Sequence, residues 1–411
     1  MYCLALKQRL KIQRVENINH QAHKGHKECK SACFATCFSY MLLPLASFVS
    51  FVVNTNPKLH AERKTGILPA DFSYDALDEF DTIIDVRSPG EFAADHIPGA
   101  RNFPVLDDAE RAAVGTIYKQ QSAFDAKKSG AAMVARNIAR HIDAEFGAQP
   151  KKWKPLIYCW RGGSRSGAMT HILKSIGWNA WQLEGGYKSY RALVMRQLET
   201  LPKRFSYRVV CGRTGSGKSR LLLALAEQGA QVLDLEQLAA HRGSVLGDLP
   251  DAPQPTQKTF ESLICAALQR FDRTKPVFVE AESKKVGVLR VPQPLIERMW
   301  EGRCLQLDTP QQARIALLRE EYDHLIANLP LLFHKLDCLK GLYPNERIDT
   351  WKQLASAAKW DEFVDDMLHK HYDPAYDKSM FKNYRHADAA QRLAVNDISP
   401  QGFFSLAQEI G

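Results

Sequence analysis

The stretch GRTGSGKS, residues 212–219, limits what this 411-residue chain can fold into. It satisfies the pattern G-x-x-x-x-G-K-[ST], with a strand-like run before it (YRVVCG) and a helix-like run after it (RLLLALAEQG). Glycines at this spacing let consecutive backbone N–H groups converge on phosphate oxygens at a helix N-terminus. The sequence therefore predicts an α/β domain with a phosphate-binding loop. The residues expected to bind the ligand are Gly212, Gly215, Gly217, Lys218 and Ser219.

Within this loop Lys218 is expected to place its charge on the outer phosphates, and Ser219 to offer its hydroxyl to Mg²⁺. The alternative is an ordinary glycine turn before a helix, and the pattern does not indicate nucleotide hydrolysis. Glu280 and Glu282 follow another strand-like run, PVFV, and are either acidic helpers of such a metal or solvated carboxylates at a strand end. We predict no resident metal elsewhere, because no His or Cys pair completes a zinc pattern with Cys29, Cys33 and Cys37.

A second loop, YCWRGGSRSG at residues 158–167, follows the buried strand pattern KPLIYC and precedes a helical pattern. Its backbone N–H groups would form an anion-binding nest around Cys159. The helix dipole, with Arg161 and Arg165, is expected to lower the pKa of Cys159 and populate the thiolate. The spacing Cys-x5-Arg is used by cysteine phosphatases, but a thiolate in such a loop can also carry a sulfur-type atom. The local residues leave both chemistries open.

Strand, loop and helix patterns alternate from Phe80 onward, which predicts parallel sheets with working loops at the strand C-terminal ends. We expect an N-terminal extension at residues 1–65, one α/β domain at 66–200, and a P-loop α/β domain with a helical C-terminal part at 201–411. Residues 32–53 are uncharged and mostly apolar. Three interpretations fit them: a membrane anchor, a disordered tail, or sequence upstream of the true start. We favour the last, and expect no membrane association.

The net charge of +9 does not by itself indicate a nucleic-acid partner. Ten of the 55 Lys and Arg residues but only three of the 46 Asp and Glu residues lie in the first 65 positions, so the remainder is nearly neutral. A nucleic-acid surface on the folded part must therefore be a local patch. The nine scattered cysteines fit reduced thiols and a cytoplasmic location better than a secreted disulfide framework.

Three stretches together resemble a rhodanese-like domain over roughly residues 70–195: DVRSPGEFAADHIPGARNFP (85–104), the cysteine loop, and LEGGYKSYR (183–191). The loop is one residue longer than the familiar sulfur-carrying form. A rhodanese-like domain followed directly by a P-loop domain resembles the tRNA 2-selenouridine synthase family. Further stretches agree with that family: ERAAVGTIYKQQ (110–121), HRGSVLG (241–247), VEAESKKVG (279–287) and KHYDPAYDKS (370–379).

This resemblance implies a transferase that replaces the sulfur of wobble 2-thiouridine in tRNA with selenium from selenophosphate. It also implies an S-geranyl intermediate made from geranyl diphosphate. On this chain Cys159 would carry selenium, Arg161 and Arg165 would hold selenophosphate, and residues 212–219 would hold the prenyl diphosphate. No tightly bound cofactor is implied, although Mg²⁺ can accompany the P-loop. The alternative function is a Cys-x5-Arg phosphatase fused to a P-loop kinase.

A tRNA substrate needs a basic path and surfaces for stacking bases. Six basic residues near the expected domain joint are candidates for the path, although for each one by itself we favour a solvated surface charge. They are Lys151, Lys152, Lys154, Lys203, Arg204 and Arg208. Trp160, Tyr187 and Tyr190 are candidates for stacking or for core packing.

Overall fold

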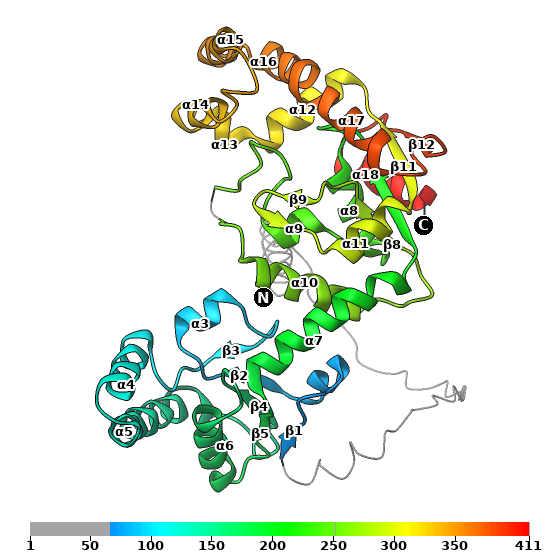
Figure 1. Ribbon diagram of the computed structural model, residues 1–411. Helices are drawn as coiled ribbons and strands as arrows, with labels where there is room; N and C mark the ends of the chain where they lie inside the picture. The colour runs from blue at the N-terminus through cyan, green and yellow to red at the C-terminus, as the bar shows by residue number, and fades with distance from the viewer. Residues whose placement is uncertain (1–65, 251, 411) are drawn as a thin grey trace, which may run out of the picture. The chain divides into compact units, whose positions relative to one another are not determined.

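Buried parallel strands organise the chain, which a computed structural model describes at residues 66–250 and 252–410 (Figure 1). The expectation for residues 1–65 lies outside this described part. The first sheet has the strand order β1-β5-β4-β2-β3, and all its pairings are parallel. Its strands are β1 (Ile67–Leu68), β2 (Thr82–Asp85), β3 (Arg101–Asn102), β4 (Pro155–Tyr158) and β5 (Trp181–Leu183).

The central strand β4 is buried at every residue, as a parallel strand covered on both faces must be. The helices of this half are α3 (Pro89–Ala94), α4 (Asp108–Gln120), α5 (Ala123–His141), α6 (Ser164–Ile176) and α7 (Gly186–Thr200), with short helical turns at Tyr74–Glu79 and Ile142–Phe146. Helix α5 begins at Ala123, where the Ser122 hydroxyl accepts a hydrogen bond from the Asp125 N–H and caps the helix.

A second parallel sheet has the order β12-β11-β6-β8-β7. Its strands are β6 (Tyr207–Cys211), β7 (Gln231–Leu233), β8 (Val277–Glu280), β11 (Arg303–Asp308) and β12 (Gln391–Ala394). The helices before β11 are α8 (Lys218–Glu227), α9 (Leu235–Ala239), α10 (Gln257–Gln269) and α11 (Gln293–Trp300), with a hairpin of β9 (Lys285–Val286) and β10 (Leu289–Arg290). The expected α/β fold class is confirmed for both halves of the described chain.

The C-terminal part is mostly helical, as expected, but it also completes the second sheet. Its helices are α12 (Gln311–Glu321), α13 (Asp323–Ile326), α14 (Leu329–Asp337), α15 (Asn345–Ser356), α16 (Trp360–Met367) and α17 (Asp373–Asn383), with a further turn at Leu368–Tyr372. The chain then returns as β12 beside β11, and α18 (Pro400–Ile410) packs on α8. Another short turn, Pro202–Arg204, lies between α7 and β6. No helix of the described residues is long and apolar enough to cross a membrane.

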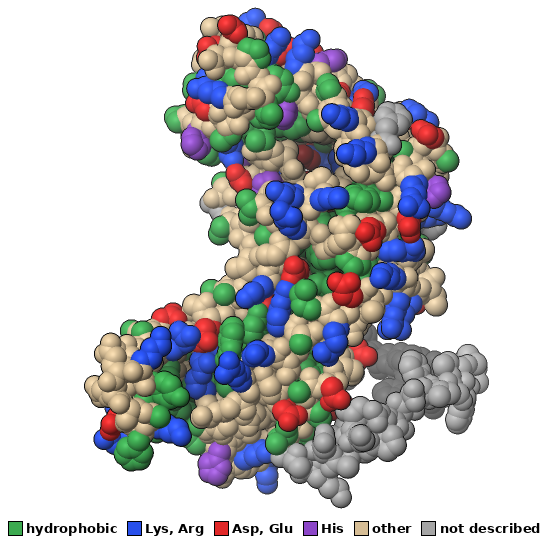
Figure 2. Space-filling view, in the orientation of Figure 1, with side chains coloured by type: hydrophobic (Ala, Val, Ile, Leu, Met, Phe, Trp, Pro, Cys, Tyr) green, Lys and Arg blue, Asp and Glu red, His purple; other side chains and the backbone are tan. Residues whose placement is uncertain are grey.

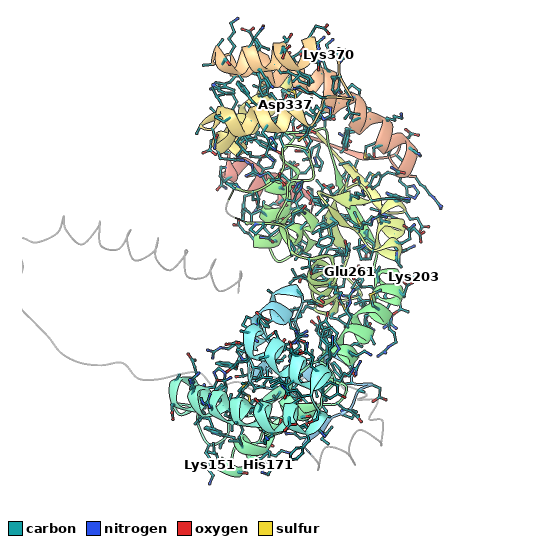
Figure 3. The ribbon with its side chains drawn as sticks, turned by 60° about the vertical axis from the view of Figure 1, so that its left-hand side comes forward. Lys151, His171, Lys203, Glu261, Asp337 and Lys370 are labelled. Carbon is teal, nitrogen blue, oxygen red and sulfur yellow. The ribbon has the colours of Figure 1, made fainter. Side chains whose placement is uncertain are left out.

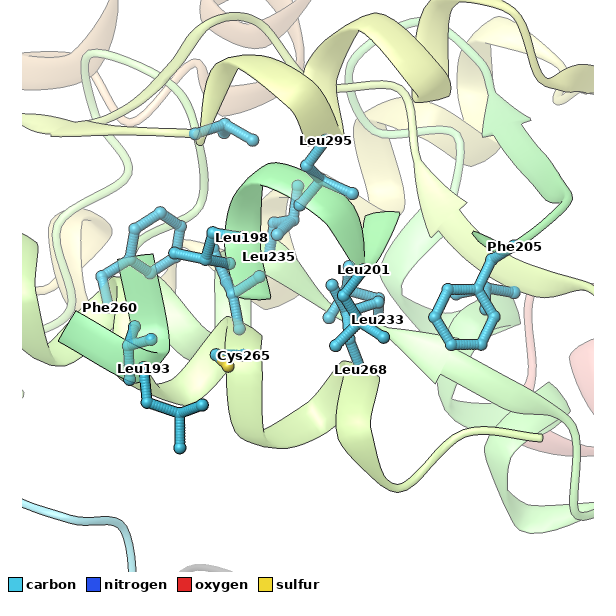
Figure 4. Close-up of a cluster of buried hydrophobic side chains, with 14 of the residues drawn as sticks. Leu193, Leu198, Leu201, Phe205, Leu233, Leu235, Phe260, Cys265, Leu268 and Leu295 are labelled. Atoms are coloured by element: carbon cyan, nitrogen blue, oxygen red, sulfur yellow. The ribbon is translucent and has the colours of Figure 1, made fainter. Parts of the chain in front are cut away.

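One apolar cluster runs from the first sheet along α7 to α10 and α11 beside the second sheet. Figure 4 shows its centre, where Leu198 of α7 and Leu201 just after this helix lie among side chains of the second half. Cys265 of α10 belongs to this cluster and is fully buried, so it packs as a small apolar residue. Burial on this scale makes α7 a structural link between the two halves.

Two glycine turns meet behind the cysteine loop. Gly186 has φ +56°, and a Cβ built on it would lie 2.2 Å from the Cys159 carbonyl oxygen. Gly162 has φ +63°, and its Cβ would lie 2.5 Å from the Leu183 carbonyl oxygen. The Tyr187 N–H donates to the Cys159 carbonyl at 2.8 Å, which is possible only because neither turn carries a side chain there. The turn after β5 therefore supports the loop after β4.

We expect Gly186→Ala to lower the free energy of unfolding by about 3 kcal/mol or more, because it adds a backbone clash to the strain of a positive φ. Gly99→Ala is the matched control: Gly99 has φ +85° but no atom within 4 Å of its Cβ position. That control should cost only about 1 kcal/mol. Urea unfolding of both variants measures the difference, and equal losses would show that the close approach of the turns is unimportant.

Candidate functional site

Cys159 lies directly after β4, in the short loop that leads into α6. Its side chain is only 4% exposed, and the Ser166 hydroxyl donates to its sulfur at 3.2 Å. The Gln182 side-chain amide donates to the Gly162 carbonyl at 2.6 Å and to the Ser166 hydroxyl at 3.0 Å. The sulfur is therefore held in a fixed place by neighbours on β5 and α6.

Opposing effects act on the pKa of Cys159. Burial by itself raises it, because a buried charge loses its solvation. The Ser166 hydroxyl, the backbone N–H groups of Ser166 and Arg161, and the charge of Arg165 act in the other direction and prevail, so the pKa is lowered. The Cys159 thiol therefore loses its proton more readily than an ordinary cysteine, the direction that the sequence predicts.

The two arginines of the loop differ in their surroundings. Arg165 is half-buried and forms an ion pair with Glu91 at 2.8 Å, and Glu91 also pairs with Arg111 of α4 at 3.2 Å. Arg161 is exposed, and its backbone rather than its side chain acts on the sulfur. The arginine charge nearest the thiolate is thus partly balanced by a carboxylate from α3, which the loop sequence does not reveal.

A cavity of about 490 Å³ opens beside this loop, with Arg87, Glu91, Trp160, Arg165 and Tyr187 in its lining. The Trp160 and Tyr187 rings lie 5.2 Å apart and are tilted by 31°. Trp160 is 36% exposed, whereas Tyr190 is fully buried and belongs to the core. Tyr187 also lines the cavity, but it is 3% exposed and belongs to the same core, so of the three aromatic candidates only Trp160 is open to solvent there.

Sequence reasoning overlooked the buried ion pair between Asp85 and Arg87, whose charged atoms lie 2.6 Å apart. The Arg87 guanidinium stacks over the Tyr187 ring at 4.1 Å and also lies 5.9 Å from the Trp160 ring. It therefore holds the aromatic wall of the cavity in place. The sequence did contain a sign of this ion pair: in DVR (85–87) two opposite charges stand two residues apart at the end of a strand, where both side chains can reach the cysteine loop.

The P-loop residues come together as predicted between β6 and α8. The Lys218 ammonium group donates to the Gly212 carbonyl at 3.1 Å, so it folds back over the loop. Ser219 is exposed, and its hydroxyl donates to a Glu236 carboxylate oxygen at 3.2 Å. Both residues line a cavity of about 650 Å³. The loop, its lysine and its hydroxyl thus face one cavity.

The distant stretch KHYDPAYDKS, largely in α17, braces this loop. The Gly212 N–H donates to the Tyr376 hydroxyl at 2.6 Å, and Arg213 pairs with Asp377 at 2.7 Å. A buried pair between Arg314 and Asp373 at 2.6 Å adds a second brace, because the Arg314 Nε also donates to the Thr214 carbonyl at 2.9 Å. Through these contacts, side chains from α17 and Arg314 of α12 hold the backbone of the P-loop in place.

Three carboxylates gather beside Lys218 and Ser219: Glu236, Glu280 and Glu282 each offer an oxygen within 4.8 Å of the others. Burial raises their pKa values, to about 8 for Glu236, to about 7 for Glu282 and well above the ordinary value for Glu280; negative neighbours add to the effect. Glu280 is fully buried, so it is not a solvated strand-end carboxylate, and one of its oxygens has no hydrogen-bond partner. Sequence reasoning missed Glu236, which follows a different strand.

The six basic candidates do not form one patch. Lys151 and Lys152 come just before β4, whereas Cys159 follows its last residue, so they lie at opposite ends of that strand. Figure 3 shows Lys151 far from Lys203. Arg208 donates to the Ile410 carbonyl at 2.8 Å, which ties it to α18. Figure 2 shows Lys and Arg scattered with Asp and Glu between them, so no field of one sign covers this face.

Known families match both halves of the chain. Residues 70–193 match the rhodanese-like domain, and residues 205–330 match the tRNA 2-selenouridine synthase AAA domain. The first match contains Cys159 and the second contains the P-loop and all three clustered carboxylates. The order and the positions agree with the resemblance inferred from the motifs.

Curated relatives named tRNA 2-selenouridine synthase agree with this assignment. The protein from Hydrogenovibrio crunogenus is 37% identical over 58% of this chain and 67% of its own length. Those from Nitrosomonas europaea and Nitrosomonas eutropha are 34% and 32% identical, over 58% and 65% of this chain and 63% and 67% of their own lengths. The chain thus spans about two thirds of the length of these relatives. It belongs to the tRNA 2-selenouridine synthase family.

Proposed function

We propose that this protein replaces the sulfur of wobble 2-thiouridine in tRNA with selenium from selenophosphate, through an S-geranyl intermediate made from geranyl diphosphate. The curated relatives support the overall activity by their name. The observation that carries the proposal is the pair of anion-binding loops, one around a thiol whose pKa is lowered and one around Lys218. One chain thus offers a cradle for each of two phosphorus-containing donors, and we propose a cytoplasmic enzyme.

The first reaction would occur at the P-loop. The thiouridine sulfur attacks C1 of the geranyl group, the carbon–oxygen bond breaks, and diphosphate leaves while the base loses its N3 proton. Lys218 and the backbone N–H groups of residues 212–219 would neutralise the charge that develops on the leaving diphosphate. Alkylation matters chemically because it turns a thiocarbonyl sulfur, which is a poor leaving group, into a good one.

The second reaction would use the loop around Cys159. The loop N–H groups and Arg165 would hold selenophosphate, a tetrahedral anion, and the Cys159 thiolate would attack its phosphorus. The P–Se bond breaks, selenide is released beside the base, and water later frees the cysteine by releasing phosphate. Selenium then adds at C2 and geranyl thiolate leaves. The overall exchange needs no oxidant, because selenium has the same oxidation level in selenophosphate and in the selenated base. The partly exposed Trp160 ring, with Tyr187 behind it, would offer the base an aromatic surface at the cavity.

A divalent cation such as Mg²⁺ fits the residues beside the P-loop. Glu236, Glu280 and Glu282 supply oxygens within 4.8 Å of one another, and the unpaired buried oxygen of Glu280 lacks a partner that a cation would provide. The Ser219 hydroxyl lies at the same place, 3.2 Å from Glu236. When bound there, the cation would neutralise diphosphate charge.

We expect Cys159→Ser to abolish selenation while leaving geranylation intact, and Lys218→Ala to reduce geranylation about 100-fold or more, since it removes a charge from the leaving group. The measurement is nucleoside mass spectrometry after incubation with 2-thiouridine tRNA, selenophosphate and geranyl diphosphate. Wild-type protein that forms neither product would refute the proposed function. Release of phosphate from an aryl phosphate that depends on Cys159 would instead favour the phosphatase–kinase alternative.

The second prediction concerns pH. Ser166→Ala removes a hydrogen bond to the thiolate, so the pKa of Cys159 should rise. Selenation should then be slower near neutral pH and should approach the wild-type rate as the pH rises above the new pKa, where both thiols are ionised.

Thiolate ultraviolet absorbance, taken as the difference from Cys159→Ser, gives the pKa directly. Ser175→Ala is the matched control, because Ser175 lies on the same helix and bonds only the His171 carbonyl among its described contacts. A rate deficit in Ser166→Ala that persists equally at all pH values would contradict this role.

A further inference from the structure

Beyond the P-loop lies a small apolar cavity of about 60 Å³ among the C-terminal helices (yellow to orange at the top of Figure 1). Its walls come from α12, α13, α14 and α16 and include Leu318, Leu325, Leu332, Phe363 and Met367. Apart from Thr214 and Arg319, every lining side chain is apolar or aromatic. An apolar cavity of this kind takes hydrocarbon rather than water.

The apolar cavity adjoins the phosphate site. Thr214 of the P-loop lines both it and the cavity that contains Lys218, and so do Leu318, Tyr322 and Tyr372. Gly215 has φ +77°, and a Cβ built on it would lie 2.8 Å from Leu318 side-chain atoms. The glycine therefore lets an apolar side chain lie directly against the phosphate-binding loop.

The chemistry of this wall does not suit a nucleotide base, which needs polar partners for its ring edges. The Tyr322 hydroxyl, one of the few polar atoms here, already lies 3.3 Å from the Ser244 hydroxyl. The cavity also lies where two apolar clusters meet, and Tyr322, Val364 and Tyr372 contact both. An apolar surface beside a diphosphate site favours a ligand with a hydrocarbon chain on its diphosphate.

We propose that this cavity receives the distal end of the prenyl chain whose diphosphate binds the P-loop. The inference rests on the proposed geranyl transfer and adds the residues that select the chain. A cavity of about 60 Å³ holds only the end of a ten-carbon chain, with the rest lying along Leu318 and Tyr322 in the larger cavity. A five-carbon chain would be too short to fill it, and a fifteen-carbon chain would exceed it.

Two variants test the cavity from half-buried positions in its lining. Ile326→Trp would fill the cavity. It should lower kcat/KM for geranyl diphosphate by at least about 10-fold, because about two carbon groups of the chain would no longer be buried. The kcat/KM for dimethylallyl diphosphate, whose chain does not reach the cavity, should stay unchanged. Val364→Ala would enlarge the cavity, and should raise the ratio of farnesyl to geranyl transfer. Leu342→Trp, at a side chain that is 71% exposed and outside the lining, is the control and should change neither.

Calorimetric binding without tRNA separates this inference from the proposed function. Wild-type protein should bind geranyl diphosphate at least about 10-fold more tightly than inorganic diphosphate, and Ile326→Trp should lower that preference, because it displaces the end of the chain. Equal affinities in the wild type would overturn the cavity assignment whatever the reaction. Geranylated tRNA made with unchanged chain preference by both cavity variants would overturn the assignment and leave the proposed function standing. Tight binding of the prenyl ligand without any tRNA product would support the cavity and refute the transfer.

Discussion

The free backbone N–H groups at the starts of α6 and α8 are the feature on which both candidate sites depend. A helix leaves its first N–H groups without partners, and a buried parallel strand just before it directs them at the sheet edge. In this protein β4 leads to the cysteine loop and β6 leads to the P-loop, so each sheet presents one anion cradle. Glycines keep both cradles open, and close approaches such as that between Gly186 and the Cys159 carbonyl hold them in shape.

The two cradles are adapted to different chemistry by the charges around them. Around Cys159, hydrogen bonds from Ser166 and the positive charge of Arg165 outweigh burial, so the thiol ionises more readily. Beside the P-loop, three crowded carboxylates hold protons more tightly because burial and mutual repulsion disfavour their charge. The first setting suits a nucleophilic sulfur. The second suits a cation that would accompany a diphosphate.

Local motifs were sufficient to predict the residues that form each cradle. Cys159 and Lys218 stand in loops whose strand and helix neighbours are adjacent in sequence, so periodicity and spacing were enough to place them. The partners of these residues were not predictable in the same way. Glu91 reaches Arg165 from 74 positions away, and Tyr376 reaches Gly212 from 164 positions away. Contacts of that kind follow from how the helices pack, and no local pattern encodes them.

The prediction of a basic path failed for a different reason: residues that are close along the chain were expected to share one surface. Lys151 and Cys159 are eight positions apart, yet an extended strand carries them to opposite ends of a sheet. By itself, then, the sequence determined the two parallel α/β halves, the two loops and their family, because these depend on short-range backbone geometry. Only the tertiary structure decided which charges neighbour the thiol, which carboxylates meet beside Lys218, and where an apolar cavity opens, because those depend on side chains brought together from distant segments.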